Sequence, residues 1–253
     1  MHHSKPALLA LLALTAGTHA AGEDSDSRFS LGIAAGYTGG VYKDYDGNHW
    51  HAAPLLHYES PHIYLDGASA GVKLYNSETQ TLTLGASYDG NAFKPNRSRD
   101  PRLQQLDRRK PGINADLGYR LDTGYGSLQT TLSQDISGNS KGTQIEVQYD
   151  YTWAVSPQLA ITPAVGATWA GKKYNRYYYG VSETEAARSG LSAYHAKGGI
   201  SPYVDLSAQY HISPHISAFA GVRAEKLSGA VKDSPMTEKK AAYSGMVGAT
   251  YNF

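Results

Sequence analysis

The sequence predicts an all-β protein, a transmembrane antiparallel β-barrel of about 12 strands. Apolar and polar residues alternate with a period of two in one segment after another, which is the pattern of half-buried strands. Tyrosine, a residue favoured in strands and at membrane boundaries, occurs 20 times among 253 residues. Short turns also alternate with long connections along the chain, as they do in membrane-spanning barrels.

The first 20 residues are predicted to be a secretory signal peptide, which leaves one barrel domain over residues 21–253. They contain Lys5, then the apolar run PALLALLALTA, then the small residues of THA, which is the order of a cleavable leader. Lys5 is the only charge that cleavage removes, so the remaining chain has equal numbers of acidic and basic residues. This balance gives no general attraction to nucleic acid. The chain has no cysteine, so no disulfide can hold the exported protein together.

The alternation is clearest in TQIEVQYDYTW, residues 143–153, where Ile145 and Val147 face one way and Glu146 and Gln148 the other. The same alternation recurs in four further segments: residues 28–37, 113–121, 202–212 and 216–225. The polar faces carry both signs of charge but very little lysine, whereas the water-facing side of a soluble sandwich is typically lysine-rich. A barrel with a polar lumen and a lipid-facing apolar side therefore fits better than a sandwich.

The connections indicate the topology. Turn-forming residues mark short turns at 76–79, 122–124, 155–158 and 212–215, and long connections are expected at 38–49, 89–110, 173–197 and 229–240. Asp66-Gly67 is a strong signal for a two-residue hairpin turn. Splitting the chain there predicts strands near 62–65 and 68–75, both short for a membrane crossing, and makes the total an even 12.

Four stretches carry a family resemblance: RLQQLDRRKPGINADLGY at 102–119, YYYGVSETEAARSGLSAYHAKGG at 177–199, KDSP at 232–235 and the terminal YNF. Together they resemble the MipA/OmpV family, the MltA-interacting proteins of Gram-negative outer membranes. The resemblance implies an outer-membrane barrel that is not an enzyme. It also implies a scaffold role in peptidoglycan processing, in which the barrel brings a lytic transglycosylase together with a murein synthase. The family assigns no chemical role to a motif residue, so no site residue follows from it.

Six cations crowd one predicted loop: Arg97, Arg99, Arg102, Arg108, Arg109 and Lys110. One interpretation is a plain solvated loop. Another is contact with lipopolysaccharide phosphates at the outer leaflet, because the guanidinium group suits bidentate phosphate binding. The third is that the loop folds into the lumen and meets Glu146, Asp150 or Asp205. The aromatic stretch KKYNRYYYG, residues 172–180, is open in the same way, as a binding surface or as packing against the barrel rim.

The chain ends on a strand whose apolar face is formed by four residues: Tyr243, Val247, Tyr251 and Phe253. We expect this face to be the signal that the barrel-assembly machinery recognises, with nothing polar after the final aromatic. A free strand end in lipid would otherwise leave backbone groups unpaired.

Motifs for catalysis or cofactor binding are weak. In HISPHIS, His211-x-Ser213 and His215-x-Ser217 place histidine and serine two residues apart, but Ser213-Pro214 is typical of a tight turn. His49 and His51 are too few for a catalytic zinc site, and no phosphate-binding loop is found, so no cofactor or metal is expected.

Two alternatives to the scaffold stay open, a passive channel for small solutes and, more distantly, a lipid hydrolase. Arginines and carboxylates share the predicted lumen, namely Arg28, Arg120 and Arg223 with Asp116, Glu146, Asp150, Asp205 and Glu225. A closed ionic network among them would leave little room for conduction.

Overall fold

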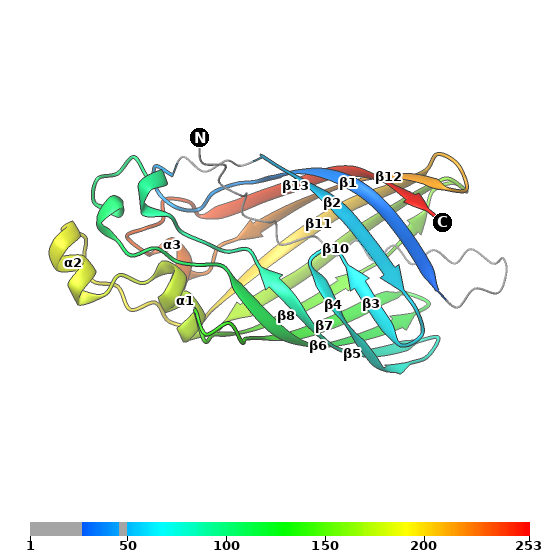
Figure 1. Cartoon of the computed structure of the whole chain (residues 1–253), viewed down its shortest axis with the longest axis horizontal. Coiled ribbons are helices and arrows are strands. Elements are labelled where there is room, and N and C mark those ends of the chain that lie inside the picture. Colours follow the sequence, from blue (N-terminus) through cyan, green and yellow to red (C-terminus); the bar gives the residue numbers. More distant parts are fainter. Residues whose placement is uncertain (1–26, 46–49) are drawn as a thin grey trace.

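The computed structural model describes residues 27–45 and 50–253, and the predicted signal peptide and His49 lie outside them. The described residues form a ring of antiparallel strands (Figure 1). The strands are β1 (Arg28–Thr38), β2 (Trp50–Glu59), β3 (Ile63–Asp66), β4 (Ser69–Asn76), β5 (Gln80–Asp89), β6 (Gly112–Thr123), β7 (Gly126–Asp135), β8 (Thr143–Asp150), β9 (Trp153–Ala154), β10 (Leu159–Ala170), β11 (Gly199–His211), β12 (Ile216–Lys226) and β13 (Ala241–Asn252). The ring closes because β13 pairs with β1 and β10 pairs with β11.

The barrel has 12 crossing strands, as predicted, because β9 continues the path of β8. β9 pairs with β10 through Ala154 and Trp153, just beyond the point where β8 ends at Asp150. The alternation is also confirmed. Val147 is 41% exposed on the outer surface, and the neighbouring Gln148 and Glu146 point into the lumen, where both bond to Tyr203.

The β3–β4 hairpin turns at Gly67-Ala68, one residue later than the predicted Asp66-Gly67 turn, because Asp66 still pairs with Ser69. Gly67 has a left-handed φ of 54°. β3 pairs with β2 only from His57 to Glu59. The earlier part of β2, which begins at Trp50, therefore extends beyond the hairpin. The Leu56 carbonyl accepts the last bond from the hairpin, from Gly67 N–H at 3.0 Å. Backbone groups alternate in direction along a strand, so Pro54 points the same way as Leu56. Proline has no N–H, which spares this exposed edge one unpaired donor in lipid.

The two ends of the barrel differ. The C-terminus and the short turns lie at one end, except the β3–β4 turn, which lies partway along the wall, and the long connections lie at the other end (Figure 1). In outer-membrane barrels the short turns face the periplasm and the long loops face outward, which orients the molecule. The described part of the loops contains α1 (Lys172–Tyr179), α2 (Glu183–Ser189), α3 (Gly229–Lys232) and the 3₁₀ turns η1 (Pro95–Arg97) and η2 (Leu103–Gln105). None of the helices in residues 27–45 and 50–253 is long and apolar enough to cross a membrane.

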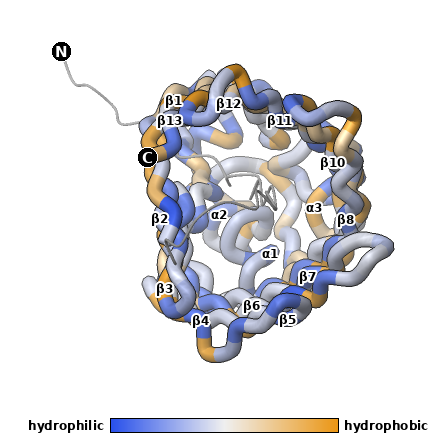
Figure 2. The backbone as a smooth tube through the Cα atoms, turned by 90° about the vertical axis from the view of Figure 1, so that its right-hand side faces the viewer, coloured by the Kyte–Doolittle hydropathy of each residue, from blue (hydrophilic) through white to orange (hydrophobic). Residues whose placement is uncertain are grey.

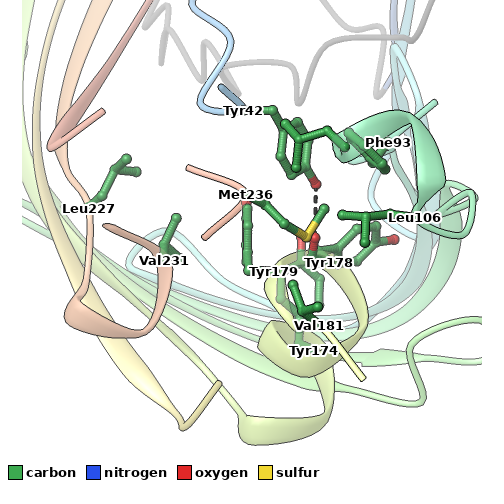
Figure 3. Packing of buried hydrophobic residues seen from close by; sticks show 11 residues of the cluster. Tyr42, Phe93, Leu106, Tyr174, Tyr178, Tyr179, Val181, Leu227, Val231 and Met236 are labelled. Atoms are coloured by element: carbon green, nitrogen blue, oxygen red, sulfur yellow. Dashed lines mark hydrogen bonds between the residues drawn. The ribbon is translucent and has the colours of Figure 1, made fainter. Parts of the chain in front are cut away.

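The loops pack together into a cap with its own apolar core. Eleven side chains form it: Tyr42, Phe93, Leu103, Leu106, Tyr174, Tyr178, Tyr179, Val181, Leu227, Val231 and Met236 (Figure 3). They come from four separate loops. Seen along the barrel, α1, α2 and α3 lie within the outline of the ring (Figure 2). Among the described residues, the buried apolar cluster is therefore in the cap over the outer end of the barrel, whereas most apolar side chains of the wall face outward.

Candidate functional site

A buried ion pair joins two loops of the cap. Arg109 precedes β6 and Glu185 lies on α2, and their side chains are 9% and 4% exposed. Arg109 Nη2 donates to Glu185 Oε1 at 2.8 Å and to the Gly180 carbonyl at 3.2 Å. The Glu185 carboxylate also accepts the N–H groups of Asp107 and Ser182 at 2.9 and 3.0 Å. The pair has enough hydrogen bonds to offset much of its desolvation cost.

The pKa of Glu185 follows from these contacts. Burial alone would raise the pKa, but the bonds from Ser182, Asp107 and Arg109 outweigh it, so the pKa lies below its ordinary value. Ser182 and Glu185 also form a reciprocal capping box at the start of α2. Glu185 therefore holds the helix and the neighbouring loop at once.

The six loop cations are in different surroundings. Arg102 Nη2 bonds to Asp100 Oδ2 at 2.8 Å, and this contact holds the pKa of Asp100 below its usual range. Arg99, Arg108 and Lys110 have exposed side chains, and Arg97 is half-buried. Of the carboxylates considered for this loop, Glu146 and Asp205 bond to Arg223 of the barrel wall, and Asp150 lies 3.9 Å from Arg120. Lipopolysaccharide contact by the exposed cations stays a prediction.

The aromatic stretch at 172–180 is packing. Tyr174, Tyr178 and Tyr179 on α1 are buried in the cap core, and the Tyr178 hydroxyl donates to the Lys110 carbonyl at 3.2 Å. The Tyr42 hydroxyl in turn donates to the Tyr178 carbonyl at 3.2 Å (Figure 3). Of the two interpretations, packing describes these three tyrosines.

Two clusters of charged lumen residues are built around Arg223 and Arg120, and Lys73 with Glu59, 2.6 Å apart, forms a third. In the first, Arg223 donates to both oxygens of Asp205 at 2.7 and 2.8 Å, and its guanidinium lies 3.8 Å from the ring centroid of Tyr203. In the second, Arg120 donates to Asp122 Oδ1 at 2.8 Å and approaches Asp150 Oδ2 at 3.9 Å. The two arginine clusters are connected along β8, because Arg223 approaches Glu146 at 3.5 Å. Gln148, which accepts from the Tyr203 hydroxyl, also donates to Asp150 at 3.4 Å.

The histidine and serine side chains of HISPHIS do not pair two residues apart in the chain. His211 and Ser217 pair across β11 and β12, and His211 Nδ1 lies 2.9 Å from Ser217 Oγ. Ser213 instead accepts the His215 and Ile216 N–H groups within its turn. Ser217 is 1% exposed, so a lipid ester has no route to its hydroxyl. This geometry is a satisfied polar contact.

The final strand lies as the alternation predicts. Tyr243, Val247, Tyr251 and Phe253 all project outward and are 45% to 72% exposed. Phe253 N–H donates to the Phe29 carbonyl at 3.1 Å, and their rings are 5.2 Å apart. The last residue therefore sits on the seam that closes the barrel. Its role as an assembly signal stays a prediction.

The periplasmic end of the barrel has exposed aromatic and apolar side chains. Beyond Asp150 every residue from Tyr151 to Gln158 is exposed, including Trp153 at 59% and Val155 at 44%. On the neighbouring turn Tyr125 is 85% exposed, and its carbonyl accepts the Tyr149 hydroxyl. Exposed aromatic residues on adjacent turns are typical of protein-binding surfaces. The sequence predicts turns at 122–124 and 155–158, but its pattern does not single out these exposed side chains.

Metal-ligating side chains are scattered in the structure. Within residues 27–45 and 50–253, no group of three or more histidine or carboxylate side chains is placed to hold a metal ion. His51 points to the lumen side of β2, and Trp50 is 64% exposed on the outer side.

Comparison with known proteins gives consistent relatives. A family model described as MltA-interacting protein MipA matches residues 31–253. The MltA-interacting protein of Escherichia coli K12 is 37% identical over 99% of this chain and 100% of its own length. A protein of the same strain named YiaT is 31% identical over 90% of this chain and 92% of its own. Outer membrane protein OmpV of Vibrio cholerae is 23% identical over 78% of this chain and 76% of its own.

Proposed function

The chain belongs to the family of MltA-interacting proteins, and from this premise we propose that it is a scaffold for murein-processing enzymes. It is a β-barrel of the outer membrane, crossing it with 12 strands. In the proposed role its periplasmic end binds a lytic transglycosylase and a murein synthase, and the barrel itself performs no reaction. The observation that carries the proposal is the 37% identity, over nearly the whole chain, to a protein named for its interaction with MltA.

The packed cap supports a scaffold over an open pore. Four loops share one apolar core, and the Arg109–Glu185 pair ties two of them together inside it. A permanently open channel needs a water-filled path through the loops, and burying large aromatic side chains such as Tyr178 and Phe93 at 0% exposure removes space from that path. Arg120 and Arg223 in the lumen are also paired with carboxylates, so they offer few free charges to a passing solute.

The periplasmic turns supply the proposed docking surface. The serines of the two Ser-Pro turns, Ser156 and Ser213, accept N–H bonds within their own turns and shape them. The exposed aromatic and apolar groups of Tyr125, Trp153 and Val155 are then the contact residues. A few turns bury only a modest area, so each complex is expected to be weak or transient.

Site-specific cross-linking in living cells tests the proposal. A photoreactive amino acid at Tyr125 or Trp153 should capture a lytic transglycosylase, identified by mass spectrometry. The same amino acid at Ile136, which is 61% exposed in a loop at the other end of the barrel, is the control and should not. Equal capture at both ends, or none at Tyr125 and Trp153, would contradict the scaffold role.

The channel is the second candidate, and planar bilayers separate it from the scaffold. The capped barrel should show little steady conductance. Large and stable conductance steps, without a captured murein enzyme, would favour the channel.

A further inference from the structure

An apolar groove of about 580 Å³ runs over the outer surface of β1, β11, β12 and β13. Small residues form its floor, among them Ala35, Ala220 and Gly245, and Val222 and Val247 flank them. Val222 and Val247 are 58% and 56% exposed on the outward side of their strands. Because this side of the wall faces the membrane, the groove opens to lipid and not to the lumen. Its volume is in the range of pockets that hold small-molecule ligands.

The middle of the groove offers no polar side-chain group to a ligand. Asp205 and Arg223 border it, but both project to the opposite side of their strands, where their charged groups bond to each other. The groove therefore fits a hydrocarbon chain along this part of its length.

The outer end of the groove is chemically different. Tyr37 and Trp50, whose ring centroids are 5.5 Å apart, lie there with Tyr243. Just beyond, Lys226 ends β12 and pairs with Ala241, and Lys240 directly precedes β13. Both lysines are exposed. The adjacent Lys239 is 3.4 Å from Glu238, so these two charges offset each other. Lys226 and Lys240 therefore leave a net positive charge at this end.

We propose that this groove is a lipid site, which holds one acyl chain of a phosphorylated glycolipid of the outer leaflet. The acyl chain lies over the small residues. The aromatic rings mark the depth at which the chain meets its headgroup, as interfacial tyrosine and tryptophan do. Lys226 and Lys240 then lie at the level of the glycolipid phosphates and attract them.

The charge favours a lipid over a second copy of the chain. Two barrels in one membrane pack about an axis along the membrane normal, so the same patch of each faces the other. The lysine ends of the two grooves would then lie at the same depth and close together, and like charges oppose that contact. A phosphorylated lipid instead complements both parts of the groove.

Native mass spectrometry of protein extracted from outer membranes in mild detergent tests the site. Ala35→Phe and Ala220→Phe fill the groove without placing a polar group in lipid. Each should lower the fraction carrying a glycolipid about tenfold, since a phenyl ring and an acyl chain cannot occupy the same space. Ala86→Phe is the matched control, since Ala86 is an exposed alanine on the outward side of β5. It should keep the wild-type fraction.

A second pair of variants tests the proposed contact between the lysines and the glycolipid phosphates. Lys226→Glu should weaken binding of added lipid A about fivefold, as expected for one lysine at a membrane surface. Lys141→Glu, at an exposed lysine of another loop, should leave it unchanged. Unchanged glycolipid in both groove variants would overturn the proposal. So would equal binding of phosphatidylglycerol and lipid A, or a wild-type dimer that Ala220→Phe splits without a change in bound lipid.

Discussion

Arg109 and Glu185 are 76 residues apart in the chain, yet their side chains meet at 2.8 Å in the interior of the cap. Arg109 lies in one loop, between η2 and β6, and Glu185 belongs to a helix of another loop. Arg188, one turn further along α2, strengthens the same connection through Asp107, at 2.6 Å. The two loops therefore behave as one body over the outer end of the barrel.

Removal of the Glu185 carboxylate should loosen the cap. Glu185→Ala leaves Arg109 buried without its ionic partner, which costs about 3–5 kcal/mol of local stability. Amide hydrogen exchange of residues 103–109 and 183–189 should accelerate accordingly, while the barrel strands stay protected.

The matched control is Glu183→Ala, because the Glu183 side chain is 79% exposed on the same helix. Its effect should stay within about 0.5 kcal/mol. Equal exchange in both variants would mean that the buried pair does not hold the loops.

Acid should loosen the cap in the same place. The pKa of Glu185 is lower in the folded protein than in an unfolded chain, so the carboxylate stabilises the cap at pH values above its unfolded pKa. That stabilisation is lost as the pH falls through the folded-state pKa. Hydrogen exchange of the α2 amides, corrected for intrinsic rates, should therefore show protection that is full at pH 7 and falls below about pH 4.

Glu185→Gln removes the titrating group and should abolish this acid-dependent loss. If the variant keeps the wild-type pH dependence, another group controls the cap.

The facing of β8 makes a quantitative prediction. Val147 meets lipid, so Val147→Arg should lower the free energy of unfolding in lipid vesicles by about 2–4 kcal/mol if the residue lies near the midplane. Gln148→Arg should cost much less, because Gln148 lies in the lumen near the carboxylates of Glu146 and Asp150. Equal losses in urea titrations of the two variants would indicate a different register.

Alternation predicted the barrel well because it is a local property. Val147 and Gln148 are assigned to opposite sides by the period of two alone. The β3–β4 hairpin was predicted from the turn preference of Asp66-Gly67, although its turn lies one residue later, at Gly67-Ala68. The strand count followed once this hairpin was placed.

Contacts between strands and between loops could not be predicted in the same way. His211 meets Ser217 and not Ser213 because of the register between β11 and β12, which no local pattern encodes. Arg109 is one of six similar cations in the same loop. Only the position of α2 makes it the buried one. The residues next to Tyr178 in the sequence are likewise compatible with both interpretations, packing in the cap or forming a binding surface.

The closing strand should be needed for assembly. Deletion of Phe253 removes its contacts with Phe29 and Tyr251 at the seam, where the ring centroids are 5.2 and 4.9 Å apart. The amount of heat-modifiable barrel in outer membranes should fall relative to wild type. Phe253→Tyr keeps an aromatic end and should assemble normally. Efficient assembly of the truncated chain would show that the terminal aromatic is not recognised.

Direct binding of a purified lytic transglycosylase to the barrel in lipid nanodiscs tests the scaffold role most directly. We predict saturable binding in the micromolar range, as for a modest and transient interface. Replacing Trp153 by Asp should weaken it about tenfold or more, as for an exposed aromatic anchor, whereas Ile136→Asp at the outer end should not change it. Absence of saturable binding by the wild-type barrel, or equal binding by the two variants, would contradict the account.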